Sequence, residues 1–111
     1  MKMTDDQRIK KIYENACNLS RIIKEKEITK EMLLEDMSIQ WMVTTPLYNI
    51  GEHSYQISQE YKKTHQEIEW DLIAGLRHRL VHDYDGTNWN IIAEAVFEEV
   101  PKLIEQISKL I

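Results

Sequence analysis

The chain has 111 residues with a formal net charge of −5, and 30% of the residues are charged. This length and composition indicate one folded domain, residues 1–111, and exclude a disordered chain or a broadly basic protein that coats nucleic acid. Because the chain has only three Gly and two Pro, an all-α fold is predicted.

The sequence also bears on the compartment. It has no run of eighteen apolar residues, and the polar segment from Met1 to Lys11 does not resemble a signal peptide. Cys17 has no second cysteine with which to pair. We therefore expect a cytoplasmic protein with no membrane partner, in which Cys17 is a small buried apolar side chain and not a nucleophile.

The first predicted helix covers roughly residues 4–26. Thr4 and Gln7 have the spacing of a capping box, and the apolar residues that follow recur at helical intervals. Thr29 is expected to cap a short turn over Lys30–Leu34.

The second long helical pattern runs from about Asp36 to Tyr61. Pro46 lies inside it and removes one backbone donor, so a kink is expected after Thr44 and Thr45. Gly51 costs such a helix about 1 kcal/mol relative to Ala. The compensation we expect is the close approach of another helix at Gly51.

A polar connection, Lys62 to Glu67, leads to a helix predicted over Trp70–Val81. The sequence Asp83-Tyr84-Asp85-Gly86 is expected to end that helix, because turn-forming residues cluster there.

A fourth helix, capped by Thr87 or Asn88, is predicted through about Val100. Pro101 either opens a fifth helix or kinks a continuous one. Together the elements predict an antiparallel bundle of four or five helices joined by short connections.

The segment that begins at Arg77 concentrates cationic and titratable side chains within an acidic chain: Arg77, His78, Arg79, His82 and Tyr84. Arginine suits phosphate oxygens and histidine titrates near neutrality, which favours acid–base chemistry on a phosphodiester without a metal. On an ideal helix Arg77 and His82 lie about 140° apart. They converge only if the helix loosens near His82, if Arg77 reaches along its axis, or if two chains contribute. The alternative interpretation of this segment is a solvated, charged helix end without a catalytic role.

Other interpretations of the histidines remain open at this stage. His78 and His82 are four residues apart and could hold zinc from one helical face, with Asp83, Glu52 or His53 as a third ligand. Because the chain has no H-E-x-x-H motif and one cysteine, we predict neither a metal site nor a cofactor.

The aromatic and lysine residues are also open to two interpretations. Trp41, Trp70 and Trp89 lie in apolar helical patterns, which favours core packing or a subunit interface over base stacking. Lys62 and Lys63 either extend a phosphate track or form an ordinary exposed helix end.

The R-x-x-x-x-H-x-Y spacing from Arg77 to Tyr84 resembles the motif of HepT-like toxins, within the HEPN superfamily of helical ribonucleases. Tyr48–Glu52 resembles the I-G-E segment of that family, Ile68–Leu76 its lead-in to the motif, and Trp89–Ile107 its terminal helices. The resemblance covers most of the chain and is most specific over residues 68–86. Relatives often carry a proline before the position of Trp70, where this chain has Gln66-Glu67-Ile68-Glu69.

This resemblance implies an all-helical homodimer in which two copies of the motif face one cleft. It implies a type VII toxin that cleaves RNA without a metal and leaves a 2′,3′-cyclic phosphate, with no DNA target expected. His82 would be the general acid or base, Arg77 would hold the scissile phosphate, and His78 would orient them. Further phosphate contacts are expected from basic side chains nearby: Arg79, Lys62 and Lys63.

The resemblance also implies a regulator. Tyr84 matches the tyrosine to which a partner nucleotidyltransferase antitoxin adds AMP, and an anionic group beside Arg77 would block the cleft. The alternative function is a catalytically inert helical module that docks such a nucleotidyltransferase.

Overall fold

The described part of the chain is built from helices. The computed structural model describes the backbone of residues 2–82 and 86–111 and the side chains of 2–80 and 86–111. Its elements are α1 (Asp5–Glu25), α2 (Lys30–Glu35), α3 (Met37–Gln56), α4 (Gln59–Thr64), α5 (Trp70–His82), α6 (Trp89–Glu94), the π-helix η2 (Ala95–Glu99) and α7 (Val100–Ser108). No strand occurs in these ranges, which confirms the predicted all-α class, and none of their helices is long and apolar enough to cross a membrane.

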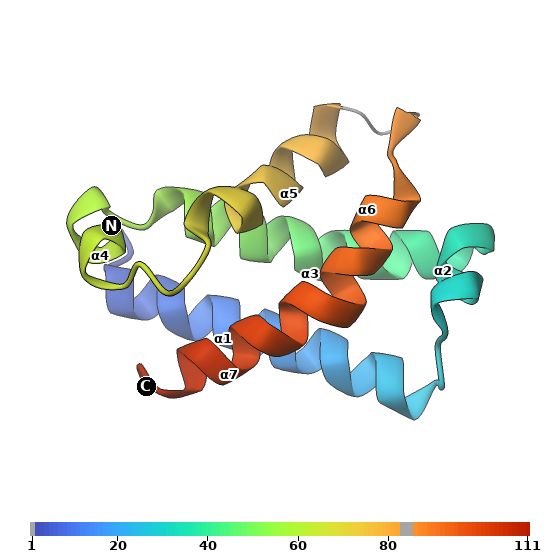
Figure 1. The fold of residues 1–111 in the computed structure, drawn as a ribbon, viewed down its shortest axis with the longest axis horizontal. Helices are drawn as coiled ribbons and strands as arrows, with labels where there is room; N and C mark the ends of the chain where they lie inside the picture. Colours follow the sequence, from blue (N-terminus) through green and yellow to red (C-terminus); the bar gives the residue numbers. More distant parts are fainter. Residues whose placement is uncertain (1, 83–85) are drawn as a thin grey trace.

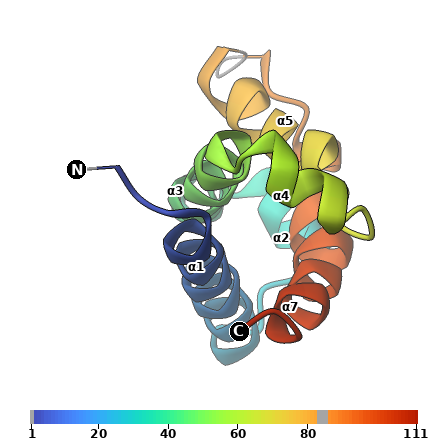
Figure 2. The same cartoon turned by 90° about the vertical axis from the view of Figure 1, so that its left-hand side faces the viewer.

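Helix α3 lies in the middle of the molecule, between α1 on one side and α5 on the other (Figures 1 and 2). The chain reverses direction from α1 to α3 and again from α3 to α5 (Figure 1). The rod formed by α6, η2 and α7 then returns along α1. Neighbouring long helices are therefore antiparallel, as predicted, and α3 is the element against which α5 is positioned.

One apolar core fills the space between these helices. Its buried side chains recur at the spacing of a helix face. Those on α1, α3 and α7 include Ile9, Ile12, Leu19, Val43, Leu47, Ile50, Leu103 and Ile107. Burial of each such side chain contributes about 1.5–3 kcal/mol, so the core holds α3 firmly in place.

The N-terminal helices begin where the sequence predicts. The Thr4 hydroxyl accepts a hydrogen bond from the Gln7 amide at 3.1 Å, and the Gln7 side chain accepts from the Thr4 amide at 2.9 Å. The Thr29 hydroxyl likewise accepts from the Met32 amide at 3.2 Å. The predicted helix over 4–26 is confirmed to within one residue, and α2 extends one residue past Leu34.

The predicted helical pattern from Asp36 to Tyr61 is in fact two helices. Helix α3 continues through Pro46 but ends at Gln56, because Ile57 is extended and Ser58 caps α4. The Asp5 carboxylate at the start of α1 accepts hydrogen bonds from the Ser58 amide at 3.0 Å and from its hydroxyl at 2.6 Å. A residue distant in sequence thus helps to fix the break.

The predicted polar connection is wrong in its first half for the same reason. Lys62, Lys63 and Thr64 form the last turn of α4, and the connection begins only at His65. Helix α5 was predicted correctly, since Trp70 begins it and it ends one residue after Val81. Asp83, Tyr84 and Asp85 lie outside the described residues.

The C-terminal rod contains the wide turn η2 just before Pro101, the residue that was expected either to open a fifth helix or to kink a continuous one. Asn88 caps α6 by accepting from the Asn90 amide at 3.1 Å. The Val100 amide then donates to the Ala95 carbonyl, one residue further back than in an α-helix, and α7 follows with Pro101 in its first turn. Because proline lacks an amide hydrogen and clashes with the preceding turn, a π-segment lets the rod continue.

Two predictions about buried side chains need correction. Trp70 is buried and its indole donates to the His65 carbonyl at 3.0 Å, and Trp89 packs partly against the core. Trp41, however, is 55% exposed on α3, so core packing is wrong for this residue. Cys17 is only partly buried, because its position lies at the edge of the apolar face of α1.

Candidate functional site

Helices α3 and α5 approach most closely where Gly51 meets Arg77. A Cβ atom built on Gly51 would lie 2.8 Å from the Arg77 amide nitrogen and 2.9 Å from the Arg77 Cβ. Both distances are well inside van der Waals contact, which lies at about 3.5–4.0 Å for carbon atoms. The glycine predicted to admit another helix therefore does so, and the helix it admits carries Arg77.

The Arg77 side chain lies against two residues of the next turn of α3. Its Nε faces the Glu52 carboxylate oxygen Oε2 in an ion pair. These two atoms are buried, so water screens the attraction between the two charges only weakly. The Arg77 guanidinium carbon also lies 5.2 Å from the centroid of the Tyr55 ring, within the range of a cation–π contact. Glu52 and Tyr55, three residues apart on one helix face, together hold the guanidinium.

The Arg77 side chain is held but still accessible. It is 34% exposed and Glu52 is 32% exposed, so both groups reach solvent. An arginine fixed by a carboxylate and an aromatic ring can bind an anion without first losing much side-chain entropy. The arrangement is suited to holding a phosphate group at one place.

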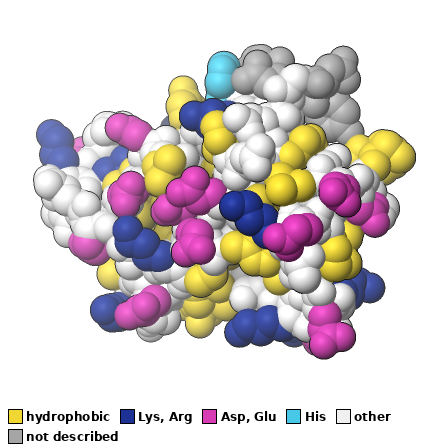
Figure 3. Space-filling view, turned by 45° about the vertical axis from the view of Figure 1, so that its right-hand side comes forward, with side chains coloured by type: hydrophobic (Ala, Val, Ile, Leu, Met, Phe, Trp, Pro, Cys, Tyr) yellow, Lys and Arg dark blue, Asp and Glu magenta, His cyan; other side chains and the backbone are white. Residues whose placement is uncertain are grey.

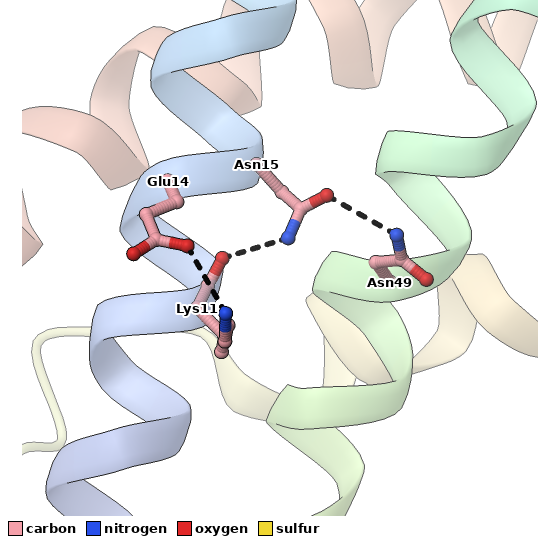
Figure 4. Close-up of polar contacts among 4 residues, drawn as sticks. All are labelled: Lys11, Glu14, Asn15 and Asn49. Carbon is pink, nitrogen blue, oxygen red and sulfur yellow. Dashed lines mark hydrogen bonds and ion pairs between the residues drawn. The ribbon is translucent and has the colours of Figure 1, made fainter.

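Polar contacts fix the rotation of α3 that presents these residues to α5. The Asn49 side chain donates to the Asn15 side chain of α1 at 3.2 Å, and Asn15 donates to the Lys11 carbonyl at 2.8 Å (Figure 4). One turn further along α3, the Arg8 guanidinium donates to His53 Nδ1 at 3.2 Å. Because α3 is tied to α1 on both sides of Gly51, Glu52 faces α5.

His53 serves this contact as a neutral acceptor. Burial lowers its pKa below the ordinary value of 6.5, and the charge of Arg8 lowers that pKa further, while Glu52 opposes the shift. Of the residues considered as a third zinc ligand, Glu52 pairs with Arg77 and His53 pairs with Arg8. No group of three metal-binding side chains occurs among the described residues, and the side chains of His82 and Asp83 lie outside them.

A shallow hollow of about 300 Å³ lies beside Arg77 on the outer surface of α5. Its lining consists of Tyr55, Asp71, Ala74, Gly75, Arg77 and His78. Arg77 and His78, which are neighbours in the sequence, both line this hollow. A larger hollow of about 480 Å³ at the start of α5 includes Lys62 and Lys63 and shares Asp71 with the first. The hollow that Lys62 and Lys63 line is therefore next to the hollow that Arg77 lines.

The second arginine of the motif is placed elsewhere. Arg79 lines a separate hollow between α5 and the C-terminal rod, together with Glu94 and Glu99. The face drawn in Figure 3 carries interspersed acidic and basic side chains and no continuous basic patch. The net charge of −5 favours local contact with a polyanion, and Arg77 is better placed for it than Arg79, which lies beside two glutamates.

His82 is the last residue of α5, and its side chain and the whole of Tyr84 lie outside the described residues. The backbone of α5 nevertheless remains helical through His82. The backbone from Arg77 to His82 is therefore helical, and a loosening that begins after His82 lies outside the described residues. Tyr55 was not predicted as a site residue, and Glu52 was considered only as a possible zinc ligand and as part of the I-G-E segment, not as a partner of Arg77.

Comparison with known proteins gives a consistent result. The family model described as "Ribonuclease HepT-like" matches residues 7–110. A protein of Thermococcus cleftensis named "Probable ribonuclease HepT" is 33% identical over 103 residues, which cover 91% of this chain and 94% of that protein. A protein of Caldanaerobacter subterraneus named a putative RNase is 31% identical over 86 residues, 78% of this chain and 77% of its own length.

A protein of Methanocaldococcus jannaschii, also named a putative RNase, is 30% identical over 101 residues, 90% of this chain and 84% of its own length. No solved structure gives a significant match.

Proposed function

The chain belongs to the HepT-like ribonuclease family, and from that premise we propose that it is a metal-independent endoribonuclease toxin of a type VII toxin–antitoxin system. The observation that carries the proposal is the setting of Arg77, fixed in the α3–α5 contact by Glu52 and Tyr55 and open to solvent beside His78. The substrate is cellular RNA, which makes the cytoplasm the place of action.

In the proposed reaction Arg77 neutralises the scissile phosphate. Cleavage through the ribose 2′-hydroxyl builds negative charge on the phosphate oxygens, and a pre-positioned guanidinium stabilises that charge most as it develops. Glu52 and Tyr55 keep the guanidinium in place, so little reorganisation is needed at the moment of reaction. Arginine here supplies the positive charge that a metal ion supplies in other nucleases.

His82 supplies the proton transfers. It removes the proton from the 2′-hydroxyl, and the leaving 5′-oxygen takes up a proton from the same His82 or from water, which leaves a 2′,3′-cyclic phosphate. General acid–base catalysis by a placed histidine contributes about 10²–10⁴-fold. His78, one residue after Arg77 in the same hollow, orients the phosphate.

We propose a homodimer as the active form. Because the backbone of α5 is helical from Arg77 to His82, the positions of these two residues lie about 140° apart around the helix axis. Two chains whose motifs face each other bring Arg77 of one copy to His82 of the other. An exposed stripe on α3 supports this arrangement, since Met37 is 59% exposed and Trp41 is 55% exposed on the helix face that leads to Tyr55.

We propose that a nucleotidyltransferase antitoxin neutralises the toxin by adding AMP to Tyr84. Tyr84 follows His82 by two residues, so the added phosphate is covalently held near the cleft. There it competes with RNA for Arg77 through charge and blocks entry through bulk.

The test is cleavage of RNA by the purified, unmodified dimer in EDTA. The parent is expected to cut, while Arg77→Ala and His82→Ala are expected to remain folded and to lose cleavage. Arg21→Ala is the matched control, since it removes the same charge from an exposed position of α1, where Arg21 contacts Glu25 and Asn18 of its own helix. If Arg77→Ala cuts as fast as Arg21→Ala, the role assigned to Arg77 is wrong.

If Tyr84 accepts AMP but no condition yields RNA cleavage, the chain is a catalytically inert docking module.

A further inference from the structure

The hollow beside Arg77 contains an aromatic side chain, Tyr55, to which the proposed reaction gives no role beyond holding the guanidinium. Tyr55 is 58% exposed, although it lies on α3, the helix in the middle of the fold. Its ring lines the hollow with Arg77 and His78. An exposed aromatic ring within a candidate RNA site is a surface on which a base can stack, since every base offers a flat π-face.

The distances place such a base next to the reacting phosphate. The guanidinium carbon of Arg77 lies 5.2 Å from the centre of the Tyr55 ring. A phosphate bound to the Arg77 guanidinium therefore lies close to the Tyr55 ring. The base of an adjoining nucleotide is the next flat group along the RNA chain, and it is the group that would reach Tyr55.

The remaining walls of the hollow suit a base better than a phosphate. Ala74 and Gly75 provide small, flat walls, and a Cβ added to Gly75 would meet nothing within 4 Å. Asp71 adds a carboxylate, which repels phosphate oxygens and accepts hydrogen bonds from the amino groups of bases. The volume of about 300 Å³ lies at the small end of ligand sites.

We propose that this hollow is a base-binding subsite, in which Tyr55 stacks the base of the nucleotide adjoining the scissile phosphate. The inference rests on the proposed function in one respect, namely that the ligand is RNA. Arg77 binds the phosphate at the rim, the base lies against Tyr55 over Ala74 and Gly75, and Asp71 faces its polar edge. Loss of the Tyr55 ring therefore weakens RNA binding and leaves the fold intact.

The experiment measures binding separately from cleavage. Each variant is made in the His82→Ala protein, which is expected not to cleave the RNA. Fluorescence anisotropy then measures the binding of short single-stranded homopolymers of each ribonucleotide at fixed salt. Tyr55→Ala is expected to weaken binding by about 5- to 150-fold, the range for loss of one base–aromatic stack. Tyr55→Phe, which keeps the ring, is expected to stay within about twofold of the parent.

A second variant fills the hollow from the opposite wall. Gly75→Leu places a side chain into open space on α5, so it is expected to raise the melting temperature because leucine favours helix, and yet to weaken RNA binding. Stability and binding then change in opposite directions, which a damaged fold does not produce.

Several results would overturn the subsite. They are unchanged binding in Tyr55→Ala, an equal loss in Tyr55→Phe, or conversion of Tyr55→Ala from dimer to monomer in sedimentation, which would make Tyr55 a subunit contact. Absence of RNA binding by the parent overturns both the subsite and the proposed function. Absence of cleavage by the protein with His82 intact, together with the expected binding pattern, overturns only the nuclease.

Discussion

Gly51→Ala is the substitution that most directly probes how the site is built. The added methyl group would lie 2.8 Å from the Arg77 amide nitrogen and 2.9 Å from the Arg77 Cβ. Neither atom belongs to a flexible side-chain end, so α5 itself has to move away from α3. That movement would shift Arg77 relative to Glu52 and Tyr55.

The expected cost follows from two opposing effects. Overpacking of this kind costs about 1–3 kcal/mol, while replacing a helical glycine with alanine gains about 1 kcal/mol. The net loss of unfolding free energy is therefore about 0–2 kcal/mol. Gly75→Ala is the matched control, because its methyl group enters open space on α5 and only the gain of about 1 kcal/mol remains.

The difference between the two variants is thus about 1–3 kcal/mol. For a domain of this size each kcal/mol shifts the melting temperature by about 3–6 °C, so thermal and urea unfolding followed by circular dichroism resolve it readily. RNA cleavage by Gly51→Ala is expected to fall at least tenfold, because a displacement of about 1 Å at a catalytic group has effects of that order or larger. If Gly51→Ala is as stable as Gly75→Ala and cleaves RNA as fast as the parent, the helices do not meet as described.

Three further predictions concern the surroundings of the site. Glu52→Gln removes a negative charge beside the phosphate-binding Arg77, so RNA binding at low salt is expected to tighten severalfold while the cleavage rate falls; a faster enzyme would show that Glu52 restrains the reaction. The pKa of His53 is lowered in the folded protein by burial and by Arg8, so the unfolded chain binds the proton more readily. Stability is therefore expected to fall as the pH drops below 6.5 and to fall less in His53→Gln, as measured by urea unfolding at successive pH values. Trp41→Glu is expected to dissociate the dimer in analytical ultracentrifugation without loss of helix content, and an unchanged dimer would remove this face of α3 from the interface.

Much of the fold follows from local chemistry that the sequence displays. The capping box of Thr4 and Gln7 and the cap at Thr29 were predictable, because each involves residues within one helical turn. The break between α3 and α4 was not predictable, because it depends on the contact of Ser58 with Asp5, which lies at the start of α1 and far away in the sequence. The π-segment η2 was also missed. The turn before Pro101 widens to accommodate the proline, and the spacing of apolar residues in the sequence does not reveal such a change.

The site divides in the same manner. Arg77, His78 and His82 are visible in the sequence as a motif, and Gly51 indicated that a helix comes close. That the approaching residue is Arg77 itself, and that Glu52 and Tyr55 hold it, depends on the crossing of two helices far apart in sequence. Tyr55 lay outside every motif, and only its exposure beside Arg77 reveals it.

The central claim is that Arg77 of one chain works with His82 of the other. It is tested by mixing Arg77→Ala with His82→Ala, each inactive alone, and refolding them together so that subunits exchange. Random exchange makes about half of the dimers mixed. A dimer has two sites, each formed by Arg77 of one chain and His82 of the other, and a mixed dimer keeps one of these two sites intact. About a quarter of the parent activity should therefore return. A mixture that stays as inactive as either variant would contradict the shared cleft and place both residues of the working pair on the same chain.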